Sequence, residues 1–67
     1  MTPAVLGQAI AQRRKAAGLT QAELAAALGV TRQLVGEMER GKPGIRLEVV
    51  LMACRELGLD LGLDRQG

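Results

Sequence analysis

The chain of 67 residues lacks several residue types on which protein chemistry commonly depends. It has no histidine and no serine, and it has one cysteine. Without these residues it has neither a nucleophile paired with a base nor a cluster of metal ligands, and it has no glycine-rich phosphate loop. We therefore expect no enzymatic activity, no metal and no cofactor. Cys54 falls on the apolar stripe of an expected helix, which favours a small buried hydrophobe over a redox role.

Long hydrophobic runs are also missing. No apolar stretch approaches the about 18 residues that a bilayer-spanning helix needs, and the N-terminus has no signal-peptide pattern. A single cysteine excludes a disulfide within the chain. These absences predict no membrane association and a reducing, cytoplasmic location.

Phenylalanine, tyrosine and tryptophan are absent, so the core must be built from leucine, valine, isoleucine, methionine and alanine. The length predicts one small domain spanning residues 1–67. A domain of this size buries only about 60% of the surface that its unfolded chain exposes. Its stability alone is therefore marginal, and association with a second copy would help.

Charge is distributed unevenly. Residues 1–47 carry seven positive and three negative side chains, whereas residues 48–67 carry two positive and four negative ones. Positive potential should therefore lie on the N-terminal part, as in proteins that bind nucleic acids. Taken alone, however, a charge split of this size favours two ordinary solvated faces over a nucleic-acid-binding surface.

Residues 20–41 predict two short helices joined by a tight turn. Thr20 and Glu23 have the spacing of a capping box at a helix start, and Gly29 supplies a residue suited to a helix exit. Val30 then fills the corner, and Thr31 caps the next helix. The pattern is a helix-turn-helix, with helices over 21–28 and 32–40.

Two further helices complete an all-α domain of four to five helices. The first is expected over about 3–17, with Leu6 and Ile10 facing the core, and the last over about 47–57, with Arg46 as a poor N-cap. One face of the last helix should be buried. Its residues are Leu47, Val50, Leu51, Cys54 and Leu57.

The end of the chain changes period. Leu59, Leu61 and Leu63 alternate with polar residues or glycine, which predicts a short β-strand over about 59–64. The chain contains no second strand candidate, so this strand would pair with that of a second copy across a two-fold axis. The alternative is a frayed tail.

With these features the chain resembles the phage-repressor-type (Cro/C1, or XRE) helix-turn-helix family. The resemblance rests on Gln21, on Ala25 at the helix contact, on Gly29-Val30 in the turn and on residues 39–42, and it covers roughly residues 5–59. It implies a homodimer that binds double-stranded DNA at a palindromic operator and regulates transcription, as a repressor. The C-terminal part further resembles the antitoxins that pair with kinase-type toxins, which implies a possible toxin partner.

The second helix of the motif would enter the major groove, and we expect its outward residues to read bases: Arg32, Gln33, Gly36 and Glu37. Arg32 suits guanine and Gln33 suits adenine. Glu37 would accept from cytosine or, equally, form an intraprotein or solvated contact. Gly36 costs about 1 kcal/mol in a helix, which either reflects close approach to DNA or to the preceding helix, or is simply tolerated. Leu34 departs from the family pattern, and covering the core rim is favoured over contact with a thymine methyl group.

Phosphate contacts are expected from Gln21, Thr31, Arg40, Lys42 and Arg46. For Gln21 the alternative is a solvated position on a helix surface. The resemblance also implies a structural ion pair between Arg14 and Glu39. For Arg13 and Lys15, solvation is favoured over DNA contact. The competing function is a protein-interaction module with weak or no DNA binding, against which the outward basic and amide residues of the second helix argue.

Overall fold

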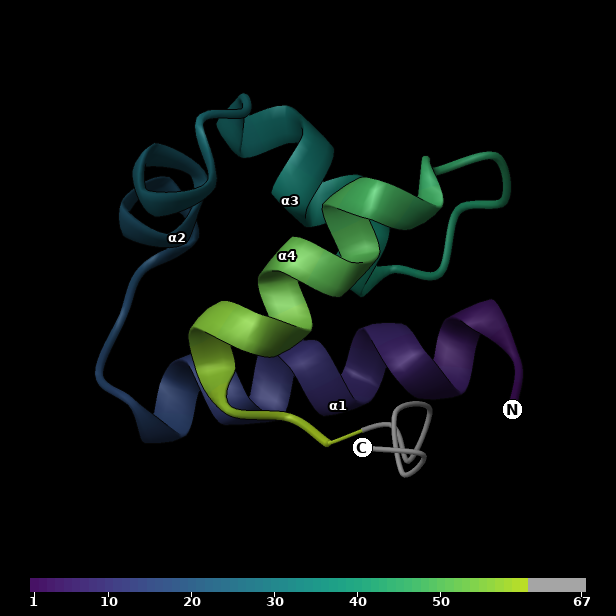
Figure 1. The fold of residues 1–67 in the computed structure, drawn as a ribbon, viewed down its shortest axis with the longest axis horizontal. Coiled ribbons are helices and arrows are strands. Elements are labelled where there is room, and N and C mark those ends of the chain that lie inside the picture. Colours follow the sequence, from purple (N-terminus) through teal and green to yellow (C-terminus); the bar gives the residue numbers. More distant parts are fainter. Residues whose placement is uncertain (61–67) are drawn as a thin grey trace, which may run out of the picture.

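A computed structural model describes residues 1–60 of the chain. These residues form four helices: α1 (Pro3–Ala16), α2 (Gln21–Leu28), α3 (Arg32–Glu39) and α4 (Leu47–Leu57). In Figure 1, α1 runs along the lower edge and α4 crosses in front of it, while α2 and α3 lie above. The all-α prediction is confirmed, and the expected helix bounds are met to within one residue at each end.

Three of the four helices have a threonine as the N-cap residue. The hydroxyl groups of Thr2, Thr20 and Thr31 accept hydrogen bonds from the backbone N–H three residues later. At Thr20 the capping box is complete, because the Glu23 carboxylate also accepts from the Thr20 N–H at 2.8 Å. These bonds satisfy donors that a helix start leaves without partners. The N-cap of the fourth helix is Arg46, whose side chain makes no capping hydrogen bond.

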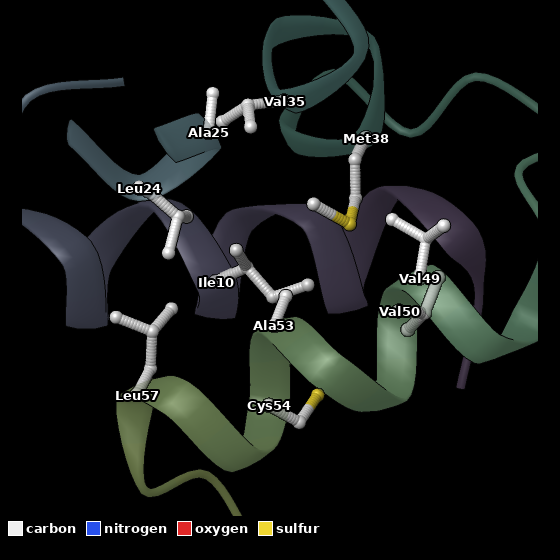
Figure 2. Close-up of a cluster of buried hydrophobic side chains, with 10 residues drawn as sticks. All are labelled: Ile10, Leu24, Ala25, Val35, Met38, Val49, Val50, Ala53, Cys54 and Leu57. Atoms are coloured by element: carbon white, nitrogen blue, oxygen red, sulfur yellow. The ribbon is translucent and has the colours of Figure 1, made fainter. Parts of the chain in front are cut away.

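The core is aliphatic and draws on all four helices (Figure 2). Ile10, Leu24 and Val35 are its largest fully buried side chains. Ile10 from α1 lies opposite Ala53 from α4, and Met38 from α3 lies beside Val49 (Figure 2). Leu6, Leu34 and Val30 are partly buried and pack against this cluster, so Leu34 does cover the rim of the core.

The expected buried face of the last helix was partly wrong. Val50, Cys54 and Leu57 are buried as expected, but Leu47 is 68% exposed and Leu51 is only partly buried. Val49 and Ala53 take their places in the core. The buried stripe is rotated because α4 packs chiefly against α1 and α2, and this packing buries the side of α4 that carries Val49 and Ala53.

The predicted C-terminal strand lies largely outside the described residues. Within residues 1–60, Leu59 and Asp60 belong to no strand. Leu59 packs against the core of its own chain, and its N–H donates to the Cys54 carbonyl at 2.8 Å. Leu61 and Leu63 fall beyond Asp60. In residues 1–60, no helix combines the length and apolar character that crossing a bilayer demands.

Candidate nucleic-acid interface

The turn between α2 and α3 fixes the relation of the two helices. Gly29 ends α2 with φ = 71°, a left-handed conformation that glycine adopts without strain. Its neighbour Val30 donates its N–H to the Ala25 carbonyl at 3.0 Å and packs against the core. Thr31 then caps α3. The helix-turn-helix predicted from residues 20–41 is therefore formed by these local bonds.

The orientation of α3 divides its residues between core and solvent. Val35 is fully buried and Met38 is 4% exposed. Arg32 and Gln33, at the N-terminal end, are exposed. No hydrogen bond or ion pair to Arg32 is found among residues 1–60, so its guanidinium donors are available for a ligand. The two residues expected to read bases thus occupy the free surface of the helix.

Glu37 has intraprotein partners. Its Oε2 atom accepts from Gln33 Nε2 at 3.3 Å and from Lys42 Nζ at 3.3 Å. The Glu37 side chain is 19% exposed, whereas that of Lys42 is 58% exposed. Of the two alternatives for Glu37, this arrangement supports an intraprotein contact. It also means that Glu37 restrains the amide of Gln33 on the outer face of α3.

Arg14 and Glu39 form an ion pair between α1 and α3. Arg14 Nε donates to Glu39 Oε2 at 2.6 Å and Nη2 donates to Oε1 at 3.0 Å, while Nη1 donates to the Leu19 carbonyl at 2.8 Å. Both side chains are less than 10% exposed. This bidentate pair, implied by the family resemblance, ties the C-terminal end of α3 to α1.

The pair has clear electrostatic consequences. Burial raises the pKa of the Glu39 carboxyl group, but hydrogen bonds from Arg14 and Gln21 outweigh it and hold the pKa below its ordinary value. The hydrogen bond to Glu39 raises the pKa of Arg14 against the opposing effect of burial. Both groups are therefore charged at neutral pH, and each compensates the other inside the protein.

Gln21 extends this network to the surface. Its Nε2 atom donates to Glu39 Oε1 at 3.0 Å, and the residue is partly buried at the start of α2. The predicted phosphate contact by Gln21 thus involves a side chain that is already held in place by Glu39. One N–H of the amide is used inside the protein, and the second remains for an external acceptor.

Gly36 does not lie on the free surface of α3. It is buried, and a Cβ atom at this position would lie 3.2 Å from Arg40 Nη1 and 3.8 Å from Gln21 Nε2. Direct base contact by Gly36, expected from its place in the reading helix, is therefore not supported. Gly36 was expected to allow close approach to DNA or to the preceding helix, or simply to be tolerated. The position of Gln21 agrees with close approach of α3 to α2.

The other expected phosphate-binding residues surround α3. Thr31 is exposed at its N-terminus, Arg40 is exposed just after its last residue, and Lys42 follows in the loop. Arg46 lies further along, at the start of α4, where Nη2 donates to Glu48 Oε1 at 3.2 Å between two largely exposed side chains. The structure thus brings Gln21, Thr31, Arg40 and Lys42 to the two helices of the motif and leaves Arg46 beyond them.

Two residues with clear roles were missed in the sequence. Arg13 was expected to be solvated, yet its guanidinium donates to the carbonyls of Leu57 and Gly58 at 3.2 to 3.3 Å, which satisfies the end of α4. A Cβ atom at Gly7 would lie only 2.5 Å from the Met38 carbonyl oxygen, so this glycine permits the close crossing of α1 and α3. In the sequence, Arg13 is one of several charged residues in its helix, and Gly7 is a glycine inside the same helix. Neither position indicates a contact between helices unless the partner helix is known.

The described residues contain no cluster of three or more side chains suited to a metal ion. Cys54 is buried, and burial raises the pKa of its thiol.

Comparisons with known proteins agree with the geometry. A search of curated proteins gave no significant match. The profile of a family described as helix-turn-helix matches residues 10–63, which is most of the chain. The matched span includes α2, the turn, α3 and every residue expected to contact DNA. The chain therefore belongs to the helix-turn-helix family of the phage-repressor (XRE, Cro/C1) type, whose members are DNA-binding transcription regulators and not enzymes.

Proposed function

We propose that this protein is a homodimeric repressor that binds a palindromic operator through α3 and reads its sequence with Arg32 and Gln33. The observation that carries the proposal is the exposed N-terminal end of α3, where Arg32 and Gln33 lie next to each other on a helix whose opposite face is fixed in the core. In helix-turn-helix proteins the corresponding end of the second helix meets base edges in the major groove.

The two residues have suitable chemistry for this task. A guanidinium group forms two parallel hydrogen bonds to guanine O6 and N7, and a carboxamide forms two to adenine N6 and N7. Arg32 is unengaged within residues 1–60, and Gln33 is steadied by Glu37 at 3.3 Å. A restrained amide loses less conformational freedom when it binds than a free one does.

Phosphate contacts would supply most of the affinity. The candidates are Gln21, Thr31, Arg40, Lys42 and Arg46, placed along α2, α3 and the following loop. Each phosphate neutralised by a cation releases counterions and adds about 0.9 to the slope of log Kd against log salt concentration. Because Lys42 is paired with Glu37, its contribution should be smaller than that of Arg40.

The proposal is tested by selecting a binding sequence from random duplexes and measuring its affinity at several salt concentrations. Arg32→Ala and Gln33→Ala should each weaken specific binding by about 1–3 kcal/mol while leaving binding to random duplex nearly unchanged. Arg55→Ala is the matched control, because it removes one exposed charge from α4. No enrichment of any sequence over random duplex would reject sequence-specific regulation.

A narrower role as an antitoxin has one observation in its favour. An apolar groove of about 280 Å³ lies between the start of α1 and the segment that leads into α4, and Met1 and Leu47 on its border are 86% and 68% exposed. Exposed apolar side chains of this kind are typical of surfaces that contact proteins. A toxin bound here would leave Arg32 and Gln33 free for DNA.

This role is tested with the product of the adjacent reading frame, if that frame encodes a kinase-like protein. The two purified proteins should form a complex that Leu47→Asp weakens and that Arg32→Ala does not affect. A complex that forms while no DNA is bound would instead favour the protein-interaction module, and absence of a complex with such a neighbour would reject the antitoxin role.

A further inference from the structure

The side chain of Arg40 lies back across α3 over Gly36. Arg40 follows the last residue of α3, and its N–H donates to the Gly36 carbonyl at 3.1 Å. A Cβ atom built on Gly36 would lie 3.2 Å from Arg40 Nη1 and 3.9 Å from Cζ, so the guanidinium is in tight contact with the place where a side chain would begin. Any other residue at position 36 would compete with Arg40 for this place.

Gln21 approaches the same place from α2. Its Nε2 atom lies 3.8 Å from the Cβ position of Gly36, and it is held there by the 3.0 Å hydrogen bond to Glu39 Oε1. Glu39 in turn is fixed by Arg14 at 2.6 Å. Two nitrogen donors on different helices, Arg40 Nη1 and Gln21 Nε2, are therefore both within 4 Å of one point above Gly36.

These donors have hydrogen-bonding capacity to spare. Within residues 1–60, no hydrogen bond or ion pair of the Arg40 side chain is found. The guanidinium group has five N–H donors, and Gln21 uses only one of its two amide N–H groups on Glu39. A tetrahedral anion presents several oxygen acceptors at once, which matches two donors that converge from different directions.

We propose that Gly36 is a positioning residue for DNA binding: its missing side chain lets Arg40 and Gln21 converge on one phosphate group of the duplex. The proposal rests on the DNA binding proposed above and adds to it a reason for the glycine. A glycine inside a helix costs about 1 kcal/mol relative to alanine. Here the cost is offset by a phosphate contact that a side chain at position 36 would weaken, and weaken more the larger it is.

The variants Gly36→Ala and Gly36→Met separate this role from others. Alanine requires Arg40 to move by a few tenths of an ångström. We expect methionine, a good helix former with a longer side chain, to displace the guanidinium further. Both variants should fold at least as well as the unaltered protein, which thermal unfolding checks. A loss of DNA affinity in a fully folded variant is then not a folding defect.

Binding is measured on a random-sequence duplex across a salt series, so that base reading plays no part. Gly36→Met should reduce the slope of log Kd against log salt by about 0.9 for each protomer bound, the value of one phosphate contact, and Gly36→Ala should reduce it less. Arg40→Ala should reproduce the effect of methionine. Lys15→Ala is the control, because it removes an exposed charge from α1.

Combined variants give the decisive comparison. In an Arg40→Ala background, Gly36→Met should lose most of its effect, and the remainder should vanish when Gln21→Ala is added. An unchanged slope in Gly36→Met would overturn the proposal. So would a slope change that stays at full size when Arg40 and Gln21 are both replaced, because the methionine would then act by colliding directly with DNA. Failure of the unaltered protein to bind any duplex would instead reject the proposed function and this inference with it.

Discussion

At the scale of single residues, Gly7 controls how closely α1 and α3 cross. The nearest atoms to its missing Cβ are backbone oxygens of Met38 and Glu39, at 2.5 and 2.6 Å, which no side-chain movement can relieve. Gly7→Ala should therefore force the helices apart and lower the free energy of unfolding by about 1–3 kcal/mol, despite the better helix propensity of alanine. Urea unfolding followed by circular dichroism measures this change.

The control for Gly7→Ala is Gln8→Ala, the adjacent exposed residue of the same helix. A surface change of this kind should stay within about 0.5 kcal/mol. Equal stability of the two variants would mean that α1 and α3 adjust to the additional methyl group without loss.

The Arg14–Glu39 pair predicts an acid-sensitive component of stability. Because the pKa of Glu39 is lowered in the folded protein, folding favours the carboxylate, and this contribution is fully present above the ordinary glutamate pKa of about 4.3. It is lost progressively as the pH falls below that value and through the lowered pKa of the folded state. Unfolding measured between pH 7 and pH 2 should show this decline.

Single and double variants of the pair check its origin. Arg14→Met leaves a buried carboxylate without its partner and should cost about 3–5 kcal/mol at neutral pH, most of the stability of so small a domain. The double variant Arg14→Met, Glu39→Leu should be much closer to the unaltered protein and should lack its share of the acid dependence. If the double variant keeps the same pH profile, other carboxylates are responsible.

Residues with a local role were predictable from sequence, and those with a role between helices were less so. Thr20, Glu23 and Gly29 act on neighbours within four positions, so their spacing alone revealed them. Gly7 and Arg13 act on residues more than 30 positions away, and nothing near them in the chain marks the partner. Arg14 and Glu39 were found only through the family resemblance.

At the scale of elements, α4 is the helix with the least local support. Arg46 occupies its N-cap in an extended conformation but accepts no hydrogen bond from the first turn, and its cationic side chain opposes the helix dipole. Its contact with Glu48 joins two side chains that are 77% and 67% exposed and so contributes little. The helix depends instead on burial of Val49, Val50 and Ala53 and on Arg13 at its end.

Arg46→Ser should therefore stabilise the protein by about 0.5–1 kcal/mol, because a hydroxyl at an N-cap accepts from a free N–H of the first turn. The same substitution should weaken DNA binding at low salt if Arg46 contacts a phosphate. Arg46→Ala removes the charge without adding a cap, so it should share the loss of DNA affinity and gain less stability. Thermal unfolding and salt-titrated binding follow the two effects separately, and equal stability of the two variants would contradict the capping argument.

The helix boundaries were predicted accurately because N-cap residues and glycines set them. The buried face of α4 was predicted less accurately. The spacing of Leu47, Val50, Leu51, Cys54 and Leu57 fits a helical stripe, and so does the set that the structure buries. Helical periodicity defines a stripe to within roughly one residue, about 100° of rotation. Which of two overlapping stripes is buried depends on the helices that pack on it, and that is tertiary information.

At the scale of the whole molecule, residues 1–60 of a single copy supply one candidate reading helix, α3. In the proposed complex, α3 of one protomer would contact only a few base pairs, which is too short a sequence for specific regulation. Two protomers related by a two-fold axis would place their α3 helices about 34 Å apart, on one face of the duplex. The proposed homodimer thus has a consequence for the spacing of the operator.

An insertion of about 5 base pairs between the half-sites turns one of them to the opposite face of the duplex. For a rigid dimer, affinity should then fall to that of an isolated half-site, while the salt dependence per protomer stays the same. The double variant Leu61→Asp, Leu63→Asp, which changes the leucines expected at the dimer contact, should behave on the intact operator as the unaltered protein does on a half-site. Sedimentation velocity at the concentrations used for binding should show the variant at the mass of one chain and the unaltered protein at twice that mass. If the unaltered protein instead sediments as a single chain and tolerates the insertion, each α3 binds DNA independently, and specificity must come from contacts within one half-site.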